Sequence, residues 1–171
     1  MSYEQTFDPN VVCDYWLASC LAELDACGSD PILLSYAGIG VPVWDNCCGQ
    51  LVVGIENIYR SQTFPAEDSS DERCSGEVVS LVVLATLVRC VPTIDDRGRP
   101  PSQQAMADAH AGVLRDQGIM WKAMSAPMPP TWEWERAFVR SATVTPTGGC
   151  VAIETRATIG IDAARWCADC P

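Results

Sequence analysis

The segment TPTGGCVAIETRATIGI, from Thr145 to Ile161, most constrains how this chain can fold. It joins a Gly-Gly turn signal to a run in which two kinds of side chain alternate. Alternate residues of a strand point to opposite sides of its sheet. Here one side is Val151, Ile153, Thr155, Ala157, Ile159 and Ile161, and the other is Ala152, Glu154, Arg156 and Thr158. The pattern predicts a half-buried strand from Cys150 to Ile161 that follows a hairpin turn.

Five further segments have the pattern of a regular element. Strands are predicted at Leu51 to Tyr59, Val78 to Cys90 and Trp134 to Val144, and helices near Asn10 to Ala26 and Ser102 to Met124. The apolar stripe of the second helix is Met106, His110, Val113, Gln117, Met120 and Met124, widened by Leu114 and Trp121. Residues 28–46, rich in Gly and Pro, are expected to form an extended connection.

This order of elements predicts an α+β fold, with an antiparallel-leaning four-stranded sheet and two helices packed on one face. A length of 171 residues is typical of a single domain. We expect one domain over residues 1–171, with an acidic loop at 61–76 and a short irregular C-terminal tail at 162–171.

The charge and the hydropathy of the sequence argue against several classes of function and location. The net charge is −11, and Lys122 is the single lysine against 22 carboxylates, so direct nucleic-acid recognition is not expected. The longest apolar run, Val78 to Val91, includes an arginine and is too short for a membrane helix. The N-terminal residues lack the features of a secretion signal, so we expect the protein to be made in a cytoplasm.

The ten cysteines are the most unusual feature of the composition. Cys48, Cys74, Cys90 and Cys150 lie at or near strand ends and are expected to be structural. Two interpretations stay open for them, which are disulfides between neighbouring strands and small buried apolar residues. Cys167 and Cys170 have the CxxC spacing of zinc and redox sites, but their position at the chain end favours an inert or disulfide-bonded tail.

No set of residues has the pattern of an active site. The one histidine, His110, lies on the apolar stripe of a helix, where a structural role is the more common one. The carboxylate pairs Asp95/Asp96 and Glu133/Glu135 lie in polar segments, where solvated charge is usual. We therefore predict no catalytic residue, no cofactor and no metal ligand.

Several motifs together resemble a known family. These are WDNCCGQLVVGI, a TFP-plus-acidic loop, CSGEVVSLVVLATLVRCVPT, a linker with two prolines, a helix and TPTGGCVAIETRATIGI. The pattern, which covers roughly Trp44 to Ile161, is similar to tail terminator and head-to-tail connector proteins of long-tailed phages (siphoviruses) of actinobacteria. The GGCV turn and the RCxP strand end are its more specific parts.

The resemblance implies a structural virion protein of the tail, located at the head-tail junction. Its α+β subunit would form a homohexameric ring that ends tail-tube growth and joins the tail to the capsid. The implied partners are other copies of the chain, the major tail tube protein and the head-tail connector or stopper protein. DNA would pass through the lumen without specific binding, and no membrane is involved.

Candidate interface residues come from two segments, the acidic loop and a proline-flanked aromatic pair. They are Glu67, Asp68, Asp71, Glu72, Trp132 and Trp134. The acidic loop has an equally supported interpretation as a solvated loop without a partner. One alternative function is the head-side stopper of the same junction. An alternative from another class, a small cysteine-rich metal or redox protein, depends on Cys167 and Cys170 alone.

Overall fold

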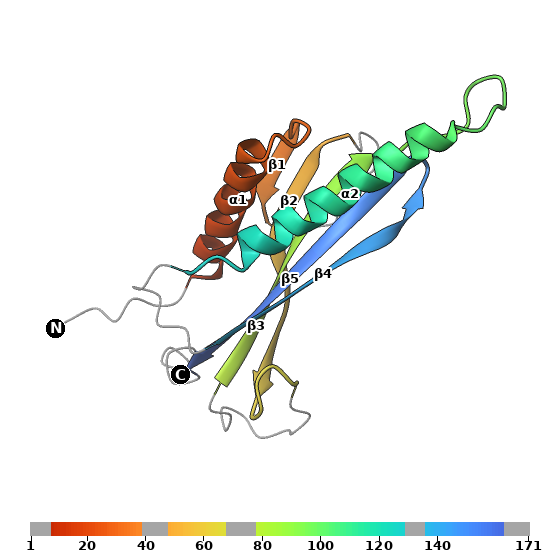
Figure 1. Cartoon of the computed structure of the whole chain (residues 1–171). Coiled ribbons are helices and arrows are strands. Elements are labelled where there is room, and N and C mark those ends of the chain that lie inside the picture. Colours follow the sequence, from red (N-terminus) through yellow and green to blue (C-terminus); the bar gives the residue numbers. More distant parts are fainter. Residues whose placement is uncertain (1–7, 39–47, 68–77, 129–135, 163–171) are drawn as a thin grey trace.

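The computed structural model describes residues 8–38, 48–67, 78–128 and 136–162, and two helices and five strands follow one another in these ranges. The elements are α1 (Pro9–Ala26), β1 (Leu34–Ala37), β2 (Gln50–Ser61), β3 (Val78–Cys90), α2 (Gln103–Met124), β4 (Arg136–Thr147) and β5 (Cys150–Asp162). Both helices lie on the same side of one twisted sheet (Figure 1). The fold is therefore α+β, with one layer of helices on one layer of strands.

The strands have the order β1-β2-β3-β5-β4. All neighbouring strands are antiparallel except β1 and β2, which are parallel. The sheet is thus mixed and has five strands, and the expectation of four strands is wrong in this detail. The segment expected to be a plain connection contains β1. Four residues are too few to establish an alternating pattern, and β1 forms because Gly49 and β2 offer it hydrogen-bonding groups.

The long apolar run expected as a strand becomes β3, with the predicted bounds Val78–Cys90. It pairs along its length with β2 on one side and β5 on the other. Ten of its thirteen residues are buried. Residues of both faces of this central strand are buried, which fits its nearly continuous apolar sequence.

The helices begin where the sequence predicts. At the start of α1, the Asp8 carboxylate accepts a hydrogen bond from the backbone N–H of Asn10 at 2.9 Å, and Pro9 occupies the first turn. At the start of α2, the Ser102 hydroxyl accepts one from the backbone N–H of Ala105 at 3.1 Å. Neither helix among the described residues has the length and apolar character needed to cross a membrane.

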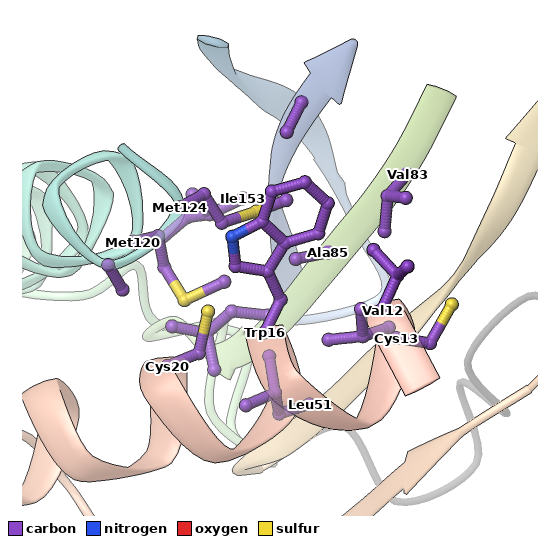
Figure 2. Packing of buried hydrophobic residues seen from close by; sticks show 14 of the residues in the cluster. Val12, Cys13, Trp16, Cys20, Leu51, Val83, Ala85, Met120, Met124 and Ile153 are labelled. Atoms are coloured by element: carbon purple, nitrogen blue, oxygen red, sulfur yellow. The ribbon is translucent and has the colours of Figure 1, made fainter. Parts of the chain in front are cut away.

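The main core lies between the helices and the sheet. Its centre is Trp16 of α1, which is fully buried against Met120 and Met124 of α2 and Ile153 of β5 (Figure 2). The indole nitrogen of Trp16 is buried and has no hydrogen-bond partner among the described residues. The core thus holds two helices and the central strands together around one aromatic side chain.

The apolar stripe predicted for α2 is buried only in its C-terminal half. Ile119, Met120, Ala123 and Met124 are buried, whereas Met106 is 49% exposed and His110 is exposed. His110, for which a core or a half-exposed position was expected, is thus on the exposed side of that range. The reason is that the contacts of α1 reach only the C-terminal end of α2, where the Ser19 hydroxyl donates to the Ala123 carbonyl at 3.1 Å.

Candidate assembly surfaces

His, Cys, Asp and Glu side chains form no group of three or more that could hold a metal ion in the described ranges. The Asp95 carboxylate stabilises its own loop, because it accepts hydrogen bonds from the backbone N–H groups of Arg97 and Arg99. These bonds and the Arg99 side chain lower the pKa of Asp95, the Arg99 backbone N–H contributing most.

A disulfide joins the ends of two neighbouring strands. Cys48, just before β2, is bonded to Cys90, the last residue of β3, with 4.9 Å between the Cα atoms. Cys150 lies opposite Cys90 in the register of β3 and β5 and is also disulfide-bonded. It packs with Val88 and Ala152 in a small apolar cluster separate from the main core. Three of the four cysteines singled out in the sequence thus lie together at one end of the sheet.

Loss of this disulfide is expected to destabilise the fold without affecting any reaction. The bond spans 42 residues, and closing a loop of this size stabilises a protein by roughly 2–4 kcal/mol. The variant Cys48→Ser/Cys90→Ser should therefore show a lower free energy of unfolding in urea under non-reducing conditions. An unchanged unfolding midpoint would contradict a structural role for the pair.

The three described free thiols differ in accessibility. Burial raises the pKa of Cys20 to about 12 and, with the nearby charges of Asp14 and Asp8, that of Cys13 to about 11. Cys13 and Cys20 are buried in the core between α1 and the sheet, whereas Cys27, just after α1, is exposed. A thiol needs its thiolate form and access to react, so Cys13 and Cys20 are poor nucleophiles.

Thiol labelling of the native protein at pH 8 should therefore modify Cys27 and spare Cys13 and Cys20. Mass spectrometry of the labelled peptides checks this expectation, and rapid native labelling of Cys20 would refute it.

The raised pKa values also predict a pH effect on stability. The buried thiols favour the folded state most below pH 9, and this contribution is lost as the pH rises from about 9 to 12, because the unfolded thiols ionise first.

A buried ion pair fastens α2 to the end of β3. The Arg89 Nε donates to Asp116 Oδ2 at 2.8 Å, and the two side chains are 7% and 3% exposed. The Ser29 hydroxyl accepts from Arg89 at 2.6 Å and donates to the other Asp116 oxygen at 2.7 Å. The group joins three distant parts of the chain, and no signal in the sequence marked Arg89 and Asp116 as partners.

A second charged network lies on the sheet face away from the helices. Arg156 of β5 binds Glu56 of β2 through two nitrogens and also pairs with its neighbour Glu154 at 2.7 Å. The hydrogen bonds of Glu56 contribute most to the raised pKa of Arg156. Arg140 of β4 lies beside Arg156 in the register but forms no ion pair within the described part of the chain.

Charge is distributed unevenly across the sheet. The first 59 residues, which include α1, β1 and most of β2, contain eight carboxylates and no lysine or arginine. The β4 sequence contains Arg136 and Arg140 and no carboxylate. This asymmetry is readable in the sequence as a charge pattern. The strand order places β1 and β4 at opposite edges of one sheet, and β1 itself contains no charged residue.

Most of the interface candidates from the sequence lie outside the described residues. Glu67 is described and is exposed. The other interface candidates, which are Asp68, Asp71, Glu72, Trp132 and Trp134, lie outside the described ranges. The same holds for Cys74, Cys167 and Cys170. The described surface nevertheless has exposed apolar side chains at the sheet edges, with Leu33 72%, Leu34 47% and Phe138 50% exposed.

The described surface thus combines exposed apolar side chains with an uneven distribution of charge. No known family model matches the chain, and no curated protein matches it either.

Proposed function

We propose that this chain is a structural virion protein, the tail terminator ring at the head-tail junction of a long-tailed phage. The observation that carries the proposal is the two-layered subunit, in which α1 and α2 cover one face of the sheet (Figure 1). This is the α+β arrangement that the resemblance in the sequence implies. In this role the subunits form a hexameric ring and act through the shape of their interfaces, without bond chemistry.

The surface charge supports the same role. A net charge of −11 repels the phosphate backbone, so a ring built from this chain would let DNA pass without binding it. The ring would contact the major tail tube protein on one side and the head-tail connector or stopper on the other. Exposed apolar side chains such as Phe138 and Trp121 provide contact area for such partners.

The test is the removal of the chain from a phage that encodes it. A terminator stops polymerisation of the tail tube, so its loss should give tubes longer than normal without heads. The head-side stopper, the competing role at the same junction, would give tails of normal length that fail to join heads. Electron microscopy of the particles distinguishes the two outcomes. Normal tails joined to heads would overturn both.

Symmetry provides an independent measurement. A ring formed by this chain should show six copies in assembled particles, by image averaging at the head-tail junction. A twofold or threefold arrangement of the chain there contradicts the proposal.

The acidic loop can be tested in the same particles. We expect that deletion of residues 66–72 alters tail length or head attachment, because a segment rich in carboxylates and Ser can pack against a neighbouring ring. The control is Asp96→Ser, which removes a carboxylate from another polar loop and leaves the Arg97 backbone N–H that binds Asp95. Unaltered tails would leave the acidic loop as a solvated surface segment.

The alternative of a metal or redox protein makes a different prediction. Purified protein would then contain stoichiometric zinc, or its Cys167 and Cys170 would cycle between thiol and disulfide with a measurable potential. Metal analysis and thiol counting after reduction settle this alternative. A structural ring protein should show neither property.

A further inference from the structure

We propose that Cys150 forms a disulfide with Cys47. Together with the Cys48–Cys90 bond, it fastens the chain before β2 to two strands at one end of the sheet. Cys150 is disulfide-bonded, and its partner follows from the reach of the chain. The bond is therefore independent of the proposed tail role.

Four cysteines are candidates for the partner of Cys150. Each sulfur takes part in one disulfide, and Cys90 is bonded to Cys48. Three others, Cys13, Cys20 and Cys27, are free thiols. Of the ten cysteines in the sequence, those that are left lie outside the described ranges and are Cys47, Cys74, Cys167 and Cys170.

The position of Cys150 limits where its partner can come from. Cys150 is the first residue of β5 and the register partner of Cys90, the last residue of β3. Register partners on antiparallel strands have about 4.5–5.5 Å between their Cα atoms. Cys150 is 4% exposed and packs with Val88 and Ala152. Its partner must bring a Cα atom within about 7 Å of this end of the sheet, which is the limit for a disulfide.

Cys74 is attached to the opposite end of the sheet. It precedes Val78, the first residue of β3, by four residues, which span at most about 14 Å. β3 has thirteen residues, so its two ends are about 40 Å apart. Even a fully extended connection therefore leaves Cys74 more than about 20 Å from Cys150.

The two C-terminal cysteines are attached to that opposite end as well. Asp162, the last residue of β5, pairs with Val78, and the two strands run in opposite directions (Figure 1). Cys167 and Cys170 follow Asp162 by five and eight residues, which span at most about 18 Å and 29 Å. β5 has thirteen residues and a length of about 40 Å, so neither cysteine comes as close to Cys150 as a disulfide requires.

Cys47 is attached to the same end of the sheet as Cys150. Its Cα atom is about 3.8 Å from that of Cys48. The Cα atoms of Cys48 and Cys90 are 4.9 Å apart. The Gly49 N–H donates to a carbonyl of β3 at 3.1 Å, which holds the chain beside Cys48 on that strand. Cys47 is therefore within reach of Cys150, one strand further across the sheet.

The two bonds join three neighbouring strands. Cys48 precedes β2 and is bonded to the end of β3, and Cys47 is bonded to the beginning of β5. The chain before β2 is thereby linked to the hairpin of β4 and β5. At this end, the order of the three central strands is fixed covalently as well as by backbone hydrogen bonds.

Each bond forms by oxidation. The two thiols lose two protons and two electrons, and a small-molecule disulfide such as oxidised glutathione accepts them and becomes two thiols. Reducing compartments keep such pairs as thiols. The double link therefore closes when the folded protein meets an oxidising medium.

The test is peptide mapping of the full-length protein after treatment with oxidised glutathione. The remaining free thiols are alkylated in denaturant, and trypsin and chymotrypsin then cut the chain without reduction. Three peptides should stay linked, which are residues 45–51, 90–97 and 141–156. The first contains only Cys47 and Cys48, and each of the others contains one cysteine. The mass of the linked species should be lower than that of the three reduced peptides by the four hydrogens that two disulfides lose.

Thiol counts of variants identify the pairing within these peptides. Cys47→Ala should raise the number of alkylated thiols by one, with the new label on Cys150. Cys150→Ala should raise the number by one as well, with the new label on Cys47, and the double variant should return to the original number. The matched control is Cys27→Ala, which removes a free thiol and should lower the number by one.

Unfolding in urea gives a second readout. Without reductant, Cys47→Ala should lower the midpoint of unfolding, and the double variant should fall no further than Cys150→Ala alone, because both changes remove the same bond. With reductant, Cys47→Ala should unfold at the midpoint of the unmodified chain. A difference that persists in reductant contradicts the bond as its source.

The proposal is overturned if the peptide of residues 141–156 is linked to one that contains Cys74, Cys167 or Cys170. It is also overturned if Cys150 stays free after oxidation while the Cys48–Cys90 bond forms, or if Cys47→Ala leaves the number of alkylated thiols unchanged. None of these outcomes depends on tail length or head attachment, so failure of this bond is distinguishable from failure of the tail role.

Discussion

Replacing Asp116 with asparagine is expected to lower the free energy of unfolding by about 3–5 kcal/mol, because it leaves the buried Arg89 guanidinium without its counter-charge. The Ser29 hydroxyl would keep one hydrogen bond to Arg89 but supplies no charge. Arg89→Met should cost less than this, since Asp116 would keep the half-exposed Arg115 as a cationic partner at 3.5 Å. Equilibrium unfolding in urea measures both.

The double variant Arg89→Met/Asp116→Leu is the control for this expectation. It removes both charges, so it should cost clearly less than the sum of the two single variants. Additive losses would show that the ion pair is not the source of the effect. Arg99→Met at the exposed Arg99–Asp95 pair should change stability by no more than about 1 kcal/mol, because surface ion pairs contribute little.

Truncation of Trp16 to alanine is the second change with a large expected effect, about 3–5 kcal/mol. The indole is fully buried between the two helices and the sheet, so its loss leaves a cavity that both layers border (Figure 2). Trp16→Phe should cost considerably less, because it keeps an aromatic ring and removes a buried N–H that has no described partner.

Trp121 provides the matched control for this prediction. It is a tryptophan of the neighbouring helix, but it is 51% exposed. Trp121→Ala should shift the free energy of unfolding by no more than about 0.5 kcal/mol. Equal losses of stability in Trp16→Phe and Trp16→Ala would contradict the expectation that a phenyl ring can replace the indole and its unpartnered nitrogen.

The sequence alone was enough to locate the long elements. Val78–Cys90 was predicted with its observed bounds, and the other long strands and helices with ends within three residues. These elements could be found because hydrophobic periodicity, helix caps and glycine turns are local properties of the chain. The Gly-Gly turn before Cys150 is such a case, since both glycines have the positive φ values that the hairpin requires.

The exposed N-terminal half of α2 shows where periodicity was insufficient. Met106 and His110 continue the apolar stripe of Met120 and Met124, yet only the latter two are buried. A stripe indicates which face a helix can bury, but the neighbouring element decides how much of it is covered. Because α1 packs against only one end of α2, the remainder of the stripe is a surface.

The sequence by itself thus determined the helices, the four long strands, the α+β class and an excess of negative charge, because each depends on neighbouring residues or on composition. Only the tertiary structure decided the short strand β1, the Cys48–Cys90 bond and the buried pair of Arg89 and Asp116. It also placed β1 and β4 at the two edges of the sheet. These features join residues far apart in the chain, and strand order, which no local pattern encodes, decides which of them meet.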